Sequence, residues 1–129
     1  MYSKDYEKWN ILKQNLNAIK GQTLRVKEGE IWWCAIGVNI GNEIDGKNEL
    51  YERPVIVIKK FPNNSFLVVP LSKTEREHEF AIPFAIQSNL SKAIISQVRV
   101  VSPKRLIRRM HKLSSKKLLA ITNHLKRMI

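Results

Sequence analysis

Arg53 and Ser72 are the two residues whose types and positions first suggest chemistry. They bracket two apolar segments, "VIVIKKF" and "FLVVPL", which are joined by the turn-forming residues 62–65. The start of one strand of a hairpin lies beside the end of its partner, so we expect Arg53 and Ser72 to be neighbours. An arginine fork and a hydroxyl group can together bind a phosphate group. The alternatives are that Arg53 pairs with Glu49 or Glu52 on the surface and that Ser72 caps a turn.

Glu43 lies in the loop that leads to Arg53, and it is the candidate for proton transfer at the same rim. In RNA the ribose 2′-hydroxyl is an internal nucleophile, so a protein needs only to align it and to stabilise the charge that develops on phosphorus. This reaction requires no metal ion, and no Cys and His spacing typical of zinc is present. We therefore expect no metal and no cofactor. His78 and His111 are an alternative acid and base pair, although no spacing supports them.

Further residues near this rim could bind a nucleic acid. Tyr51 could stack on a base, as aromatic side chains do in many RNA-binding proteins. Lys47, Lys73 and Arg76 lie in loops next to the rim and could hold the phosphate backbone. Each of these cations could equally be a solvated surface residue.

The positive charge is concentrated in the last part of the chain. The protein has 23 Lys and Arg residues against 11 Asp and Glu residues, a formal net charge of +12. Residues 80–129 contain 11 of the cations and none of the acids. A region of this kind favours a polyanion or an acidic protein as partner. The alternative is a charged surface that keeps the protein soluble.

The length and composition indicate one globular domain. The chain has 129 residues, of which 43% are hydrophobic, enough to bury a core. The longest apolar run is too short to cross a membrane, and the N-terminus lacks the apolar core of a signal peptide. The only cysteine, Cys34, excludes an intrachain disulfide and suits a reducing compartment. These features predict a cytoplasmic protein without a membrane partner.

The elements that would position these residues follow from the apolar pattern. Residues 1–22 predict a helical extension capped by Ser3 or Asp5 and ending at Gly21, because apolar residues recur every three or four positions. Residues 24–113 predict a small barrel of five or six short strands, including "EIWWCAIGVNI", "HEFAIPFAI" and "KAIISQVRVV". The segment "RRMHKL" could be strand or helix. Residues 114–129 predict a closing helix.

Four of these segments, in this order, resemble the MazF/PemK toxins of bacterial type II toxin–antitoxin systems. They are "EGEIWWCAIGVNIGNE", "RPVIVI", "VVPLS" and "SQVRVVSPKRL", and the resemblance covers residues 28–128. It implies a mainly β fold, a small SH3-like barrel with a C-terminal helix, to which the N-terminal helix is an addition. It also implies a homodimer, and an acidic antitoxin that blocks the RNA groove.

The resemblance further implies a metal-independent endoribonuclease that cuts single-stranded RNA and leaves a cyclic phosphate and a 5′-hydroxyl. The arginine of the family maps onto Arg53, its Thr or Ser onto Ser72 and its loop glutamate onto Glu43. The Gln-x-Arg motif maps onto Gln97 and Arg99, which are expected to bind RNA. Some members use an Arg and an Asp as acid and base just before this motif, where the present chain has residues 94 and 96, Ile and Ser. Their mechanism therefore does not carry over.

A non-catalytic protein of the same fold is the alternative function. One toxin with this barrel poisons DNA gyrase without cutting RNA, and a plain nucleic-acid-binding module is a further possibility. The Arg53 and Ser72 pair favours the nuclease, because a protein that only binds gyrase does not need it.

Overall fold

The computed structural model describes residues 3–19, 25–74 and 77–129. These residues form two α-helices, seven β-strands and two short 3₁₀ helices. The helices are α1 (Tyr6–Asn17) and α2 (Ser115–Met128), and the 3₁₀ turns are η1 (Ile95–Gln97) and η2 (Pro103–Arg105). The strands are β1 (Glu30–Ala35), β2 (Glu52–Lys60), β3 (Phe66–Ser72), β4 (Ala81–Ile86), β5 (Asn89–Ile94), β6 (Arg99–Val101) and β7 (Leu106–Lys112). No helix among the described residues is both long and apolar enough to cross a membrane.

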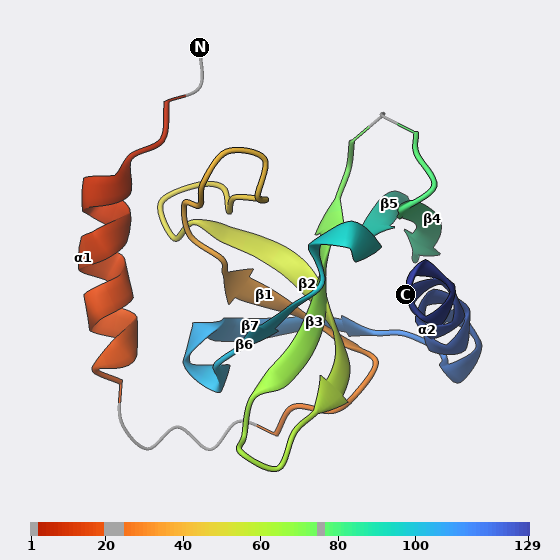
Figure 1. The fold of residues 1–129 in the computed structure, drawn as a ribbon. Coiled ribbons are helices and arrows are strands. Elements are labelled where there is room, and N and C mark those ends of the chain that lie inside the picture. The colour runs from red at the N-terminus through yellow and green to blue at the C-terminus, as the bar shows by residue number, and fades with distance from the viewer. Residues whose placement is uncertain (1–2, 20–24, 75–76) are drawn as a thin grey trace.

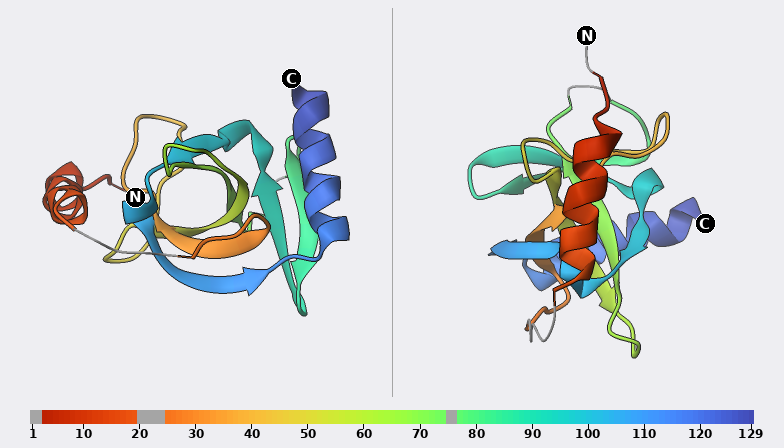
Figure 2. Two further views of the ribbon diagram at one scale, coloured as in Figure 1. Left: turned by 90° about the horizontal axis from the view of Figure 1, so that it is seen from below. Right: turned by 90° about the vertical axis from the view of Figure 1, so that its left-hand side faces the viewer.

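The strands form one antiparallel sheet that curls into a small barrel. Their order is β4-β5-β3-β2-β1-β7, and β6 pairs with β3 beside this path. The helices α1 and α2 lie on opposite sides of the barrel (Figures 1 and 2). This arrangement confirms the predicted barrel with an N-terminal and a C-terminal helix. The undecided segment "RRMHKL" belongs to β7, which pairs with β1.

One predicted strand was wrong. Residues 92–101 were expected to form a single strand, but the structure divides them into the end of β5, the turn η1 and β6. The division has a topological reason, because β5 pairs with β3 at Leu71 and Ser72 whereas β6 pairs with β3 at residues 66–68. Pro70 lies between these two pairings, so on that side of β3 the missing amide hydrogen of proline is tolerated.

Three apolar clusters hold the elements together. The first cluster fills the barrel interior. It contains Trp32 from β1 and, from the hairpin of β2 and β3, Val57 and Phe66. The second cluster lies under α2 and includes Ile121 and Leu125 on the predicted apolar face of that helix. The third cluster lies under α1 and joins it to the barrel end.

Helix α1 docks through a tryptophan on a glycine. Asp5 caps the helix by accepting a hydrogen bond from the Lys8 amide, as predicted. Trp9 is buried, and a Cβ atom at Gly37 would lie 2.1 Å from its indole ring. Gly37 also has φ +89°, a backbone conformation that residues other than glycine rarely adopt. The barrel end is therefore shaped to receive this helix. The predicted end of the helix at Gly21 lies outside the described residues.

Two carboxylates are buried in the barrel wall and are neutralised by arginines of β7. Glu52 is bound through both carboxylate oxygens by Arg108, at 2.9 and 3.2 Å. Glu30 accepts a hydrogen bond from Arg109 at 3.0 Å, and two further hydrogen bonds come from the Lys27 amide and the Trp32 indole. A buried carboxylate requires such partners because an unpaired charge is costly to remove from water.

The hydrogen bonds of Glu30 make the free energy of unfolding depend on pH. Burial alone would raise the pKa of Glu30, but its bonds to Lys27, Arg109 and Trp32 together lower it below the ordinary value of 4.5. A carboxyl group whose pKa is lowered by folding contributes stability above its unfolded pKa and loses this contribution as the pH falls through its folded pKa. We expect Glu30→Gln to be less stable than the wild type by roughly 2 kcal/mol near pH 7. Denaturant unfolding from about pH 7 down to about pH 3 should show this difference shrinking, and a constant difference would contradict the assignment.

Candidate functional site

The central hairpin brings Arg53 and Ser72 together. In the pairing of β2 with β3, Val55 lies opposite Pro70, and the same register continued toward the open end sets Arg53 opposite Ser72. The Arg53 Nη1 atom donates a hydrogen bond to the carbonyl oxygen of Leu71 at 3.2 Å. The predicted neighbourhood of these two side chains is therefore present.

Arg53 is held from two sides. Besides the bond to Leu71, its Nε atom donates to the carbonyl oxygen of Asp45 at 2.8 Å. One bond comes from the neighbouring strand and the other from the loop before β2, so the position of the guanidinium depends on both. The hydroxyl of Ser72 accepts a hydrogen bond from the Thr74 amide at 3.3 Å, which also turns the chain out of β3.

Arg53 and Ser72 line one groove of about 380 Å³, here called the Ser72 groove. Lys47 and Lys73 lie at the same groove, as the sequence predicts. The remaining lining residues mix small polar groups with apolar side chains: Trp33, Asn48, Glu52, Pro54, Leu71, Ile86, Asn89, Ser91 and Met110. Because the Glu52 carboxylate is bound by Arg108, the cations Lys47, Arg53 and Lys73 give this groove a positive character.

A second groove adjoins the first at Arg53. It has a volume of about 630 Å³ and is here called the Tyr51 groove; its lining residues are Ser3, Asp5, Asp45, Gly46, Lys47, Asn48, Tyr51 and Arg53. Lys47, Asn48 and Arg53 are common to both grooves. Tyr51 packs against Trp9 in a T-shaped arrangement, at 5.8 Å between ring centroids and an interplanar angle of 61°. Its ring therefore links the groove to α1.

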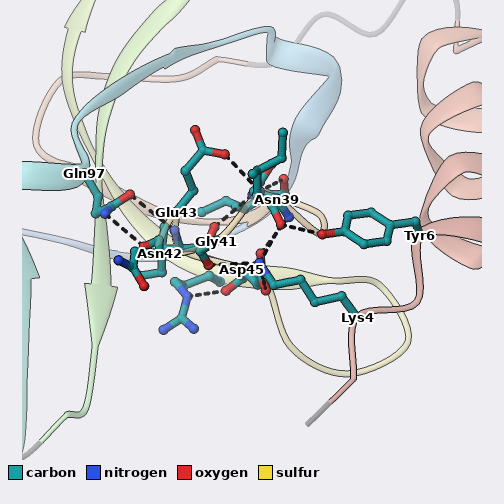
Figure 3. A network of polar contacts seen from close by, with 12 residues as sticks. Lys4, Tyr6, Asn39, Gly41, Asn42, Glu43, Asp45 and Gln97 are labelled. Atoms are coloured by element: carbon teal, nitrogen blue, oxygen red, sulfur yellow. Dashed lines mark hydrogen bonds and ion pairs between the residues drawn. The ribbon is translucent and has the colours of Figure 1, made fainter.

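Glu43 lies apart from Arg53 and Ser72. Its carboxylate accepts a hydrogen bond from the Ile40 amide at 2.9 Å, so it closes a turn of its own loop (Figure 3). Glu43 is exposed and lines a third groove together with residues of α1, rather than the Ser72 groove or the Tyr51 groove. The expected meeting of all three side chains at one rim is thus observed for Arg53 and Ser72 only.

The other predicted RNA-binding residues occupy different surroundings. Gln97 binds the 42–44 segment through both ends of its side-chain amide. Its oxygen accepts a hydrogen bond from the Ile44 backbone amide at 3.2 Å, and its nitrogen donates to the Asn42 carbonyl at 3.4 Å (Figure 3). Arg99 stands at the start of β6, opposite Val68. Arg76 lies outside the described residues.

The basic residues after β6 are engaged with their own chain. Lys104 donates to the Asn17 carbonyl at the end of α1, and Arg105 donates to the Ala35 carbonyl at 3.0 Å while lying over the ring of Trp9. Together with the ion pairs of Arg108 and Arg109, these contacts give this basic segment a role in holding β1, β7 and α1 together.

The structure excludes Cys34 as a nucleophile. Its side chain is fully buried in the barrel, and burial raises the pKa of the thiol to about 12. A thiol of this kind is protonated near neutral pH and inaccessible to a substrate. Across the described ranges, no three His, Cys, Asp or Glu side chains converge in a way that could hold a metal ion.

Sequence reasoning missed Trp33 as a residue of the site. Every residue of β1 is buried except Trp33, and Trp32 before it lies in the barrel interior. Trp33 is half-buried, lines the Ser72 groove and carries the Arg108 guanidinium at 4.9 Å from its ring centroid. The signal available in the sequence was the period of two in a strand, which sends consecutive side chains to opposite faces.

Comparison with known protein families gives one match over most of the chain. The model of the family described as "PemK-like, MazF-like toxin of type II toxin-antitoxin system" matches residues 27–129. Helix α1 lies before the matched region. Curated protein sequences gave no match.

Several solved structures share the fold. MazF from Deinococcus radiodurans, Form-I, is similar with a TM-score of 0.68 and 13% sequence identity, over 82% of this chain and 97% of that chain. The MazE-MazF structure from the same organism, Form-II, has a TM-score of 0.62 and 12% identity, over 82% and 96% of the two chains. A mycobacterial endoribonuclease in complex with its cognate antitoxin has a TM-score of 0.58 and 10% identity, over 79% and 92%. At these identities the likeness is one of fold.

Proposed function

The chain belongs to the PemK-like, MazF-like toxin family of type II toxin–antitoxin systems, and we propose that it is an endoribonuclease that cleaves single-stranded RNA without a metal ion. The observation that carries this proposal is the pairing of Arg53 with Ser72 across two strands, in a groove that also presents Lys47 and Lys73. An arginine fork, a hydroxyl group and two lysines suit one phosphodiester and the charges that flank it. Trp33 and Met110 add apolar surface against which a base can pack.

In the proposed reaction the RNA supplies its own nucleophile. The 2′-hydroxyl passes its proton to solvent water and attacks the adjacent phosphorus, and the bond from phosphorus to the 5′ oxygen breaks as that oxygen takes a proton from water. The products are a 2′,3′-cyclic phosphate and a 5′-hydroxyl. Arg53 stabilises the extra negative charge on the phosphoryl oxygens, and the Ser72 hydroxyl donates a further hydrogen bond to them. The hydrogen bonds from Arg53 to Leu71 and Asp45 fix the guanidinium before the substrate arrives.

The other predicted residues take supporting parts in this proposal. Lys47, Lys73 and Tyr51 bind the RNA on either side of the scissile phosphate, since they line the two grooves that meet at Arg53. Gln97 and Glu43 shape the 39–45 loop through their hydrogen bonds to it. Arg99 contributes positive charge for binding the RNA backbone. Arg76 stays a candidate for the same role from the sequence alone.

The proposed partners follow from charge and from the family. We propose that an acidic cognate antitoxin inhibits the protein by occupying the groove in place of RNA, since a net charge of +12 favours either polyanion. One fold relative is known in complex with its cognate antitoxin. We also propose a homodimer, and action in the cytoplasm, where RNA is translated and a lone cysteine stays reduced.

The decisive experiment incubates the purified protein with single-stranded RNA in the presence of a chelator and maps the new 5′ ends. We expect the new 5′ ends to lie at a short recurring sequence. Because each end carries a 5′-hydroxyl, a polynucleotide kinase should phosphorylate it directly. Parallel reactions with gyrase and supercoiled DNA test the non-catalytic alternative. RNA that stays intact while gyrase is inhibited would reject the nuclease, and so would 5′-phosphate ends that require a divalent cation.

A further inference from the structure

The N-terminal extension lies outside the part of the chain that matches the family, yet its residues Lys4 and Tyr6 contact the loop that holds Arg53. Building on the proposed function, we infer that Lys4 is a positioning residue, which fixes Arg53 for RNA cleavage by binding the 39–45 loop. On this inference the N-terminal extension, residues 1–22, supports the active site as well as packing on the barrel.

Lys4 gathers three groups of the loop around one ammonium group. Its Nζ atom donates to the carbonyl oxygens of Asn39 and Gly41, the latter at 3.1 Å, and forms an ion pair with the Asp45 carboxylate at 3.4 Å (Figure 3). The side chains of Lys4 and Asp45 are 20% and 12% exposed, so solvent screens this pair only in part. Tyr6 adds a bond from its hydroxyl to the Asn39 carbonyl at 3.1 Å.

Asp45 connects this clamp to Arg53. Its carboxylate, which Lys4 holds, also accepts a hydrogen bond from the Asn39 amide at 2.6 Å. The carbonyl oxygen of the same residue accepts the bond from Arg53 Nε at 2.8 Å. Only the backbone of one residue therefore separates the group that Lys4 binds from the group that orients the guanidinium.

The lysine is itself firmly placed. Asp5, the next residue, caps α1, and Trp9 anchors the helix in the third apolar cluster against Gly37. Ser3 and Asp5 also form part of the wall of the Tyr51 groove, which Arg53 shares. A rigid support of this kind is what a catalytic group needs, because small displacements of an aligned group are costly in rate.

The test replaces Lys4 with methionine, which keeps the length of the side chain and removes its charge. We expect kcat for RNA cleavage to fall about 10- to 100-fold, with KM changed less than about twofold and the melting temperature nearly unchanged. Lys4→Arg, which keeps a cation at this position, should recover most of the rate. The matched control is Lys13→Met, because Lys13 is an exposed lysine of α1 without a hydrogen bond or ion pair to the described residues.

A second measurement reads the position of Arg53 without relying on activity. The Arg53 Nε–H group is bound to the Asp45 carbonyl, so nuclear magnetic resonance should show slow hydrogen exchange for it in the wild type and faster exchange in Lys4→Met. Unchanged kcat and unchanged exchange in Lys4→Met, with an active wild type, would overturn this inference and leave the proposed function standing. An equal loss of rate in Lys13→Met would also overturn it. A wild type that does not cut RNA would overturn both.

Discussion

Replacing Arg53 with alanine should lower the rate of RNA cleavage by at least about a hundredfold. The guanidinium lies at the junction of the two grooves and is fixed there by the carbonyl oxygens of Asp45 and Leu71. Removing it deletes the stabilisation of charge on phosphorus, which is often the largest single contribution to such a reaction. Single-turnover cleavage of one RNA at saturating protein would measure the effect on the chemical step.

Three further variants make this result specific. Arg53→Lys keeps the charge but loses the planar fork, so we expect it to restore only part of the activity. Ser72→Ala should lower the rate about 10- to 100-fold, as for the loss of one hydrogen bond to a charged group. Arg25→Ala is the matched control, because Arg25 is exposed and lines neither the Ser72 groove nor the Tyr51 groove. Arg53→Ala that remains folded and cuts RNA at the wild-type rate would reject the site.

Replacing Arg108 with methionine should destabilise the fold by about 3–5 kcal/mol. Within the described part of the chain, Arg108 is the partner of both oxygens of the Glu52 carboxylate, and that side chain is only 4% exposed. The variant leaves a buried charge without compensation. Equilibrium unfolding in urea near neutral pH, with the free energy of unfolding extrapolated to water, would measure the loss.

Arg109→Met provides the comparison for this prediction. Its partner Glu30 is buried to a similar degree, but the Lys27 amide and the Trp32 indole still donate to it when the arginine is gone. We therefore expect Arg109→Met to cost only about 1–2 kcal/mol. Replacing Glu52 with leucine in the Arg108→Met background should recover much of the stability, since no buried charge remains. Equal costs for the two arginine variants would show that Arg108 does not act through Glu52.

The hairpin that forms the core of the site was predictable because its signals are local. Two apolar segments and the turn residues between them identify the hairpin, and Asn64 adopts a positive φ of 63° in the turn. The two helices were predictable for the same reason, since a capping residue and an apolar period lie within one segment.

The final register of the hairpin is not a local feature, because a shift between Val57 and Lys59 separates the pairing at the turn from the pairing of Val55 with Pro70. It is this second register that places Arg53 across from Ser72.

The parts that escaped prediction depend on contacts between distant segments. The pairing of Arg108 with Glu52 requires β7, β1 and β2 to lie side by side, and two register shifts between β1 and β7 decide which side chains face each other. No glycine or proline marks the turn at residues 95–97, so the sequence concealed the break between β5 and β6. The contact of Lys4 with Asp45 joins segments about forty residues apart, which no local pattern can reveal.

The buried thiol has a practical use. Cys34 is the only cysteine of the chain, it has no exposed surface, and it pairs in register with Arg53 across β1 and β2. An alkylating reagent can reach it only when the barrel opens around β1, so the rate of its modification reports how often the structure next to Arg53 opens. The rate of alkylation of Cys34 therefore measures local opening of the barrel without an added label. Comparing this rate with and without bound RNA or antitoxin would show which of the two suppresses the opening.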